Sequence, residues 1–222
     1  MNTHQITSPP PTPTRSAGIS RKIAMLAAGL FLGVSAHAGN VLVNPGFEAD
    51  GGFGNNGTPP SNWHFNGAAA YWIDQVPSAA HSGNNYYKVW GLFNGSPNTS
   101  ELYQDKSSIA TATYQADGWM TTIPTDSMWS GDGVNVSWYE VSFRNSSGTV
   151  LTKYRSDLFS STNYTTGVWY DLPVTNQVDP TSGAVIGSAA TLVAPAGTAT
   201  VRYSVKYYQL QYGGGSCYFD DV

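Results

Sequence analysis

Carboxylates cluster at the two ends of a sequence that is otherwise poor in charge. Asn44-Pro45-Gly46-Phe47-Glu48 lies near the N-terminal end, Phe219-Asp220-Asp221-Val222 closes the sequence, and only 11% of all residues are charged. Carboxylates are preferred ligands of hard cations such as Ca²⁺, which takes about six to eight oxygen ligands. The two segments therefore predict a domain whose first and last strands meet across a bound hard cation.

Aromatic side chains form a second set of candidates. Tryptophans alternate with core positions on several predicted strands and stand beside charged or polar residues. Sugars present apolar C–H faces on which aromatic rings stack, and hydroxyl groups that polar side chains bind. We predict a glycan-binding platform on one sheet face, made of Trp90, Trp119, Trp138, Lys88, Asp117, Glu140 and Arg202. Further candidates at strand edges and in loops are Tyr71, Trp72 and Trp129.

Ordinary packing in the core is the alternative for each tryptophan. Trp63 and Trp169 are assigned wholly to the core. The single cysteine, Cys217, excludes an internal disulfide and is interpreted as a small buried hydrophobe.

Enzymatic chemistry is poorly represented in the sequence. Residues 39–222 contain three glutamates, Glu48, Glu101 and Glu140, and no Glu-x-Asp-x-x-Glu strand. Two carboxylates on distant strands, such as Asp117 and Glu140, are the remaining route to glycoside hydrolysis. His64 and His81 lie in predicted turns without neighbours that indicate a triad or a zinc site. No Gly-x-Ser-x-Gly, P-loop or dinucleotide motif occurs. We therefore predict a protein that is not an enzyme.

The elements that must position these residues are predicted to be β-strands. Short runs of β-branched and aromatic residues are separated by Gly, Ser, Thr, Asn and Pro, which is typical of an antiparallel sandwich. The predicted strands are Tyr71–Asp74, Asn85–Trp90, Ala112–Thr121, Val134–Arg144, Val150–Leu158, Val168–Val174, Ala199–Gln209 and Ser216–Val222. The predicted loops are Asp50–Asn62 and Thr175–Ala190. The expected fold is all-β, an antiparallel β-sandwich of jelly-roll type.

The N-terminal 38 residues have the pattern of a secretory signal peptide of bacterial type. Arg21 and Lys22 precede the apolar run Ile23–Val34, which is too short to span a membrane, and Ser35-Ala36-His37-Ala38 offers a cleavage site. A buried core helix is the alternative. Residues 39–222 are then a single exported domain. Because Ser216–Val222 is predicted as a strand that ends the sequence, we expect it to be truncated, with further domains following Val222.

The net charge of residues 39–222 indicates which classes of binding partner are unfavourable. Three of the ten basic residues precede residue 39 and all 14 acidic residues follow it, so the net charge of this part is −7. An acidic domain without a basic cluster argues against nucleic acids and anionic membranes as partners. No later segment is long and apolar enough to be inserted in a membrane.

Four segments, in order, resemble the carbohydrate-binding modules of families 4, 9 and 22, which are galactose-binding-like β-sandwiches. They are Val41–Glu48, His81–Val89, Thr166–Trp169 and Tyr218–Val222. Trp63 stands where these families often have a structural tryptophan. The resemblance spans nearly all of residues 39–222 and implies the sandwich fold together with non-catalytic binding of a glycan.

The same resemblance implies a structural calcium ion that joins the first strand, the His81-Ser82-Gly83 turn and the last strand. Glu48 and Asp220 would supply carboxylates, and Asn85 would supply a backbone carbonyl. Ser82 stands where some members have an acidic side chain, so one negative ligand is missing. Asp221 is expected to face away from Asp220 and ranks second. The alternative is that these carboxylates only accept hydrogen bonds from the backbone at strand ends.

The expected function is non-catalytic binding of a polysaccharide or cell-surface glycan, which holds an attached enzyme or the cell near its substrate. A structural or adhesive surface domain is the first alternative, and a jelly-roll glycoside hydrolase or polysaccharide lyase is the second. The platform hypothesis requires at least two of Trp90, Trp119 and Trp138 to be exposed on one face.

Overall fold

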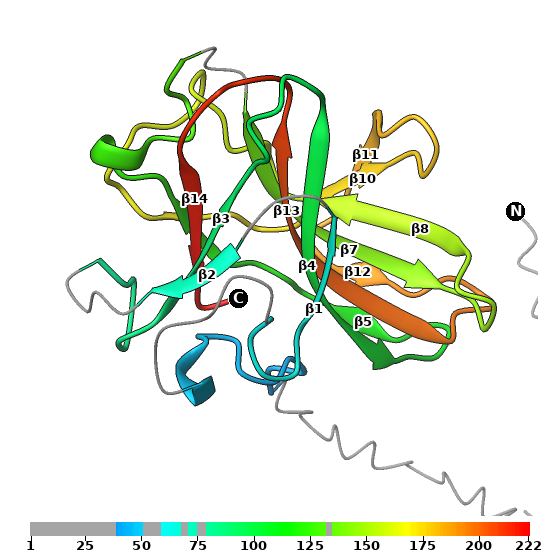
Figure 1. The fold of residues 1–222 in the computed structure, drawn as a ribbon. Coiled ribbons are helices and arrows are strands. Elements are labelled where there is room, and N and C mark those ends of the chain that lie inside the picture. Colours follow the sequence, from blue (N-terminus) through cyan, green and yellow to red (C-terminus); the bar gives the residue numbers. More distant parts are fainter. Residues whose placement is uncertain (1–38, 51–58, 68–70, 75–78, 132–134) are drawn as a thin grey trace, which may run out of the picture. The chain divides into compact units, whose positions relative to one another are not determined.

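Two antiparallel β-sheets face each other in the computed structural model (Figure 1). The structure describes residues 39–50, 59–67, 71–74, 79–131 and 135–222, without the side chains of residues 50 and 71–74. No helix within this part of the chain is long and apolar enough to cross a membrane. The predicted all-β antiparallel sandwich is confirmed.

The larger sheet has seven strands in the spatial order β1, β4, β13, β7, β8, β10 and β11. Their bounds are His64–Gly67, Asn98–Ser107, Thr200–Gln209, Val136–Arg144, Val150–Arg155, Asn176–Val178 and Val185–Ser188 in that order. The longest strands, β4 and β13, have ten residues each and lie side by side. The central part of this sheet is therefore its broadest regular surface.

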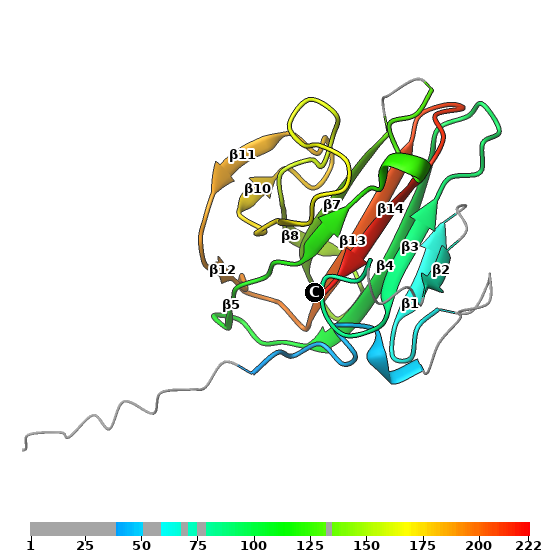
Figure 2. The ribbon, with the colours of Figure 1, turned by 90° about the vertical axis from the view of Figure 1, so that its left-hand side faces the viewer.

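The second sheet has five strands in the order β2, β3, β14, β6 and β9. Their bounds are Tyr71–Asp74, Tyr86–Trp90, Ser216–Asp220, Trp119–Thr121 and Tyr170–Asp171. A separate pair joins β12 (Leu192–Val193) to β5 (Thr113–Tyr114), and two 3₁₀ turns, η1 and η2, span Glu48–Asp50 and Pro124–Asp126. Seen from the side in Figure 2, β2, β3 and β14 lie in one layer.

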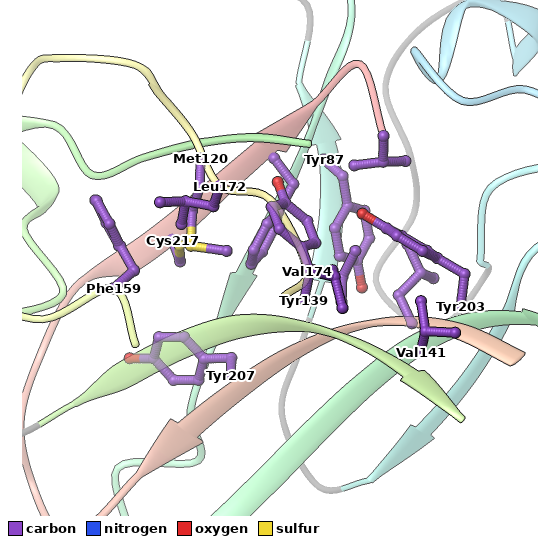
Figure 3. Packing of buried hydrophobic residues seen from close by; sticks show 14 of the residues in the cluster. Tyr87, Met120, Tyr139, Val141, Phe159, Leu172, Val174, Tyr203, Tyr207 and Cys217 are labelled. Atoms are coloured by element: carbon purple, nitrogen blue, oxygen red, sulfur yellow. The ribbon is translucent and has the colours of Figure 1, made fainter. Parts of the chain in front are cut away.

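The core fills the space between the sheets. Tyr139, Val141 and Phe143 of β7 point inward, as the alternation of the sequence predicts, and meet Phe219 of the opposite sheet through Tyr139. Figure 3 shows Tyr139 and Tyr203 among the buried side chains. Their hydroxyls donate hydrogen bonds to the backbone carbonyls of Trp119 and Asp117, at 2.6 and 2.7 Å. Two tyrosines of the larger sheet thus fix the segment that leads into β6.

Several predictions about individual residues are confirmed in the core, and one is wrong. Cys217 is fully buried and Trp63 is 3% exposed. Trp169 was assigned wholly to the core but is only half-buried. Its indole N–H donates to the carbonyl of Ala79 at 3.1 Å, and its edge meets the ring of His81. Trp169 is therefore held by a hydrogen bond to a surface segment and is not enclosed in the core.

The strands differ from the sequence prediction in several places, and the short strands β1 and β12 were not predicted. The central strand β4 was not predicted, because its inward positions are polar: Asn98, Ser100 and Gln104 are buried beside Leu102. Predicted strand Ala112–Thr121 is divided into β5 and β6. The predicted loop Thr175–Ala190 contains the paired strands β10 and β11.

Candidate functional site

The outer face of the seven-stranded sheet, turned away from the core, carries rows of polar and aromatic side chains. Cross-strand register sets these rows because partners in neighbouring strands project from the same face. One row is Glu101, Lys206 and Trp138; the next is Tyr103, Ser204, Glu140 and Arg155; the third is Asp105, Arg202, Ser142 and Lys153. We call these residues the seven-stranded face.

Charged groups in the middle of this face are bound to one another. Arg202 donates two hydrogen bonds of 2.8 Å to the two carboxylate oxygens of Asp105. The same guanidinium lies 3.5 Å from the centre of the Tyr103 ring. The hydrogen bond from Arg202 lowers the pKa of Asp105. Burial of Arg202 opposes its charge, but the bond to Asp105 prevails and raises the pKa of Arg202.

A second group of contacts surrounds two glutamates. Lys206 donates to Glu140 at 2.8 Å, and Ser204 donates to Glu101 at 2.6 Å. Glu140 is 7% exposed although it lies on the outward side of its strand. Its other carboxylate oxygen accepts the indole N–H of Trp138 at 3.4 Å. The polar groups of this face are thus held in place before any ligand binds.

A groove lies beside this network. Its floor comes from β7 and β8 and one wall from the β10–β11 hairpin. Strand β10 pairs with β8, and Figure 1 shows the hairpin next to that strand. The lining residues are Val136, Trp138, Glu140, Lys153, Arg155, Leu158, Val178, Gly183 and Tyr208. Two half-buried aromatic rings, an oriented carboxylate and two cations therefore converge on one concave surface. This combination suits a ligand that has both apolar faces and hydrogen-bonding groups.

The predicted platform is not one surface. Trp138, Glu140 and Arg202 lie on the seven-stranded face, whereas Trp90, Trp119 and Lys88 belong to β3 and β6 of the five-stranded sheet. The prediction that the three tryptophans share a face is therefore wrong. Alternation along a strand separates inward from outward side chains, but it does not state which sheet the strand joins.

The tryptophans of the five-stranded sheet have protein partners. Trp119 stacks against His81, with ring centres 3.8 Å apart and planes inclined by 14°. Lys88 lies 5.5 Å from the centre of the Trp90 ring and forms a 2.7 Å ion pair with Asp126. One side of the Trp119 ring is thus covered by the chain itself.

The remaining predicted ligand-binding residues lie apart from the groove. Asp117 is exposed in the segment between β5 and β6, and its carbonyl accepts the Tyr203 hydroxyl. Trp129 packs on Phe159, with ring centres 5.1 Å apart. Trp72 and Tyr71 are in β2, and their side chains lie outside the described residues.

Several residues of the seven-stranded face and its groove were not selected from the sequence. Glu101 and Tyr103 were missed because β4 was missed. The outward positions of Lys206 and Tyr208 follow from the alternation in β13, and those of Lys153 and Arg155 from the alternation in β8. The alternation is visible in the sequence, but the pairing of β7 with β13 on one side and β8 on the other is not.

The two ends of the domain meet in a second cluster, which we call the terminal junction. Glu48 Oε1 accepts the backbone N–H groups of Asn84 and Asn85, each at 2.7 Å. Asp220 Oδ2 accepts those of His81 and Ser82, at 2.9 and 3.0 Å. The three predicted segments are therefore adjacent, and their carboxylates bind backbone N–H groups.

The last two residues close the junction. Asp221 accepts the hydroxyl of Ser82 at 2.8 Å and lies 2.7 Å from Nδ1 of His81. The backbone N–H of Val222 donates to the carbonyl of Pro45 at 3.1 Å. Figure 1 shows the C-terminus beside the N-terminal segment, drawn in blue.

The residues of the junction partly fit a calcium ion. Asn85 Oδ1 is buried and has no hydrogen-bond partner among the described residues, while Nδ2 donates to the Phe47 carbonyl at 3.2 Å. A Cβ at Gly46 would lie 3.3 Å from an oxygen of Asp221 and 3.7 Å from Asp220 Oδ1. Burial raises the pKa of Asp220 to about 6. Within the described part of the chain, no group of three or more His, Cys, Asp or Glu side chains is arranged to hold a metal.

Comparison with known proteins gives the fold. No protein-family model matches the chain, and no curated protein sequence matches it. The apo form of a cyclase from Fischerella sp. has 13% identity and a TM-score of 0.52, with 82% of this chain and 92% of that chain covered. This similarity supports the sandwich fold alone.

Structural neighbours of the chain also include carbohydrate-binding modules. A module from the β-sandwich superfamily, studied for its promiscuous specificity, has 12% identity and a TM-score of 0.48, with 77% of this chain and 62% of that chain covered. TmCBM61, solved in complex with β-1,4-galactotriose, has 17% identity and a TM-score of 0.43, with 81% and 93% covered.

Proposed function

We propose that this protein is a non-catalytic carbohydrate-binding domain whose ligand lies in the groove of the seven-stranded face. The observation that carries the proposal is the groove itself, in which Trp138 and Tyr208 stand beside polar groups already fixed by hydrogen bonds and ion pairs. Stacking on the rings would provide most of the binding energy, and the fixed polar groups would orient the sugar hydroxyls. We include in this proposal that the domain is a carbohydrate-binding module of the kind found in families 4, 9 and 22.

Binding to a panel of soluble and insoluble polysaccharides tests the proposal. Trp138→Ala should lower affinity by about five- to 150-fold, because a stacked ring contributes on the order of 1–3 kcal/mol in comparable sites. Trp90→Ala is the matched control, since it removes an indole from the outer face of the other sheet. Circular dichroism and thermal unfolding establish that both variants are folded.

The possible outcomes separate the alternatives. Loss of binding in Trp90→Ala but not in Trp138→Ala would move the site to the five-stranded sheet. A folded protein that binds no polysaccharide would be a structural or adhesive domain instead. Release of reducing ends or of unsaturated products would indicate a hydrolase or a lyase.

We further propose that Ca²⁺ binds at the terminal junction as a structural ion. The buried, unpartnered Oδ1 of Asn85 and the close carboxylates of Asp220 and Asp221 support it. Glu48 and Ser82 would complete the predicted set. Such an ion would neutralise carboxylates that burial makes unfavourable as anions. Calorimetric titration of the chelator-treated protein with Ca²⁺ tests this, and the absence of a binding isotherm would contradict it.

We also propose that the protein is exported, on the basis of the charge, apolar run and small residues in residues 21–38. N-terminal sequencing of protein recovered from the culture medium should begin near Gly39. Retention of the whole N-terminal segment in the recovered protein would contradict the proposal.

A further inference from the structure

Cationic side chains are concentrated on the seven-stranded face. Residues 39–222 contain seven basic residues against 14 acidic ones. Five of the seven basic residues project from the outer face of this sheet: Arg144, Lys153, Arg155, Arg202 and Lys206. The strands of the same face contribute three carboxylates, Glu101, Asp105 and Glu140. An acidic domain thus has one face on which positive side chains are in excess.

The positive charges are paired on one half of the face only. Arg202 of β13 is bound to Asp105 of β4, and Lys206 of β13 is bound to Glu140 of β7. On β8, at the groove, no carboxylate of the described residues forms an ion pair with Lys153 or Arg155. Arg155 donates one hydrogen bond, to the carbonyl of Ser156 at 3.1 Å. The cations of this face without an ion pair to a described carboxylate are therefore Arg144, at the end of β7 and outside the groove lining, and the two residues on the floor of the groove.

The acidic residue of the hairpin, Asp179, forms no ion pair with these cations. Hydrogen bonds from Ser182 lower its pKa most, and the charge of Lys153 contributes less to the lowering. Asp179 Oδ1 accepts the backbone N–H groups of Thr181 and Ser182, at 3.0 and 2.7 Å, and the Ser182 hydroxyl at 2.9 Å. These bonds direct its carboxylate to its own turn. Lys153 and Arg155 are nevertheless half-buried, and cations with restricted hydration are most stable beside an anion.

We propose that the groove binds an acidic glycan, with carboxylate or sulfate groups on Lys153 and Arg155 and a sugar ring on Trp138. This inference rests on the proposed function and adds the chemical class of the ligand. The planar guanidinium of Arg155 matches the two oxygens of a carboxylate or sulfate, and Lys153 adds a point charge on the same side of β8. The local cations also counteract the repulsion that an anionic polymer meets from a domain of net charge −7.

The experiment compares matched charged and neutral polymers. Chondroitin, which carries carboxylates, is paired with its carboxyl-reduced form, and dextran sulfate is paired with dextran. Affinity of the purified protein is measured at two salt concentrations, because an ionic contact weakens as salt rises. Preference for chondroitin assigns the carboxylate, and preference for dextran sulfate assigns the sulfate.

Three variants locate the contact. Lys153→Gln and Arg155→Gln should each lower affinity for the charged polymer about tenfold and lower affinity for its neutral counterpart by a clearly smaller factor. Lys106→Gln is the control, because it removes a cation of the same sheet outside the groove. Trp138→Ala should weaken binding of every polymer that the groove accepts.

Two results would overturn the inference and leave the proposed function standing. One is equal binding of charged and neutral polymers, unaffected by Lys153→Gln and Arg155→Gln. The other is an equal loss in Lys106→Gln, which would indicate diffuse attraction of a polyanion. A folded protein that binds no polymer of either kind would overturn the proposed function as well.

Discussion

At the scale of single residues, the Arg202–Asp105 pair shows how this face combines charge with order. Two hydrogen bonds of 2.8 Å fix the guanidinium in a forked arrangement, and the Tyr103 ring supports it from one side. A pair in water contributes little to stability, about 0.2–1 kcal/mol. The main contribution of the pair is to position the Arg202 guanidinium, because it holds this planar cation at a defined place beside the groove.

Asp105→Asn should make the protein less stable at pH 7 by about 0.2–1 kcal/mol, because it removes one charge of the pair. The pKa of Asp105 is lowered from 3.8 in the folded protein. The folded state therefore favours the ionised form, so the stabilisation is present above pH 3.8 and is lost as pH falls through the lower folded pKa. The measurement is urea unfolding of both proteins across this range. A gap that persists unchanged at the acidic end would mean that the charge has no part in it.

At the scale of elements, inward tyrosines of β7 and β13 determine where β6 begins. Tyr139 and Tyr203 bridge the sheets and bind carbonyls on either side of Gly118. A Cβ at Gly118 would lie 2.7 Å from the Tyr139 ring, so the glycine permits this close approach. The position of β6 therefore depends on contacts between the sheets.

Tyr139→Phe should lower the free energy of unfolding by about 0.5–1.5 kcal/mol, since the Trp119 carbonyl loses its buried donor. Chemical denaturation measures the change. Tyr208→Phe, on the solvent side of β13, serves as the control and should stay within about 0.5 kcal/mol of the parent protein. Equal effects of the two substitutions would contradict a structural role for the Tyr139 hydroxyl.

The same elements explain what the sequence could and could not predict. Strands with alternating apolar residues, such as β7 and β13, were predicted because their inward sides are apolar. Strand β4 was not, since its buried Gln104 is satisfied by the backbone of Val43, a contact distant in sequence. Outward residues of β7 and β13 could be predicted strand by strand, but the groove also needs the pairing of β7 with β13 and with β8. That pairing depends on long-range contacts, which periodicity does not contain.

At the scale of the whole domain, the two ends of the sandwich are joined through one polar cluster, in which Asn85 and Asp220 are buried. The segment around Glu48 binds the turn at Asn84 and Asn85, that turn binds Asp220 and Asp221, and Val222 returns to Pro45. Contacts between residues so distant in sequence restrict the whole chain when they form. A change that weakens the terminal junction should therefore lower the free energy of unfolding of the whole domain.

If Ca²⁺ occupies the junction, saturating Ca²⁺ should raise the unfolding temperature of the chelator-treated protein by roughly 5–10 °C, the shift expected for a ligand at about 100 times its Kd. Glu48→Gln keeps an oxygen that can accept the N–H groups of Asn84 and Asn85 but removes the charge. Its response to Ca²⁺ should therefore be smaller, while Asp157→Asn, an exposed carboxylate elsewhere, should respond like the parent protein. Differential scanning calorimetry with Ca²⁺, Mg²⁺ and chelator provides the comparison. An unfolding temperature that does not change with Ca²⁺ would mean that hydrogen bonds alone close the junction, and the carboxylates would then be structural acceptors for the backbone.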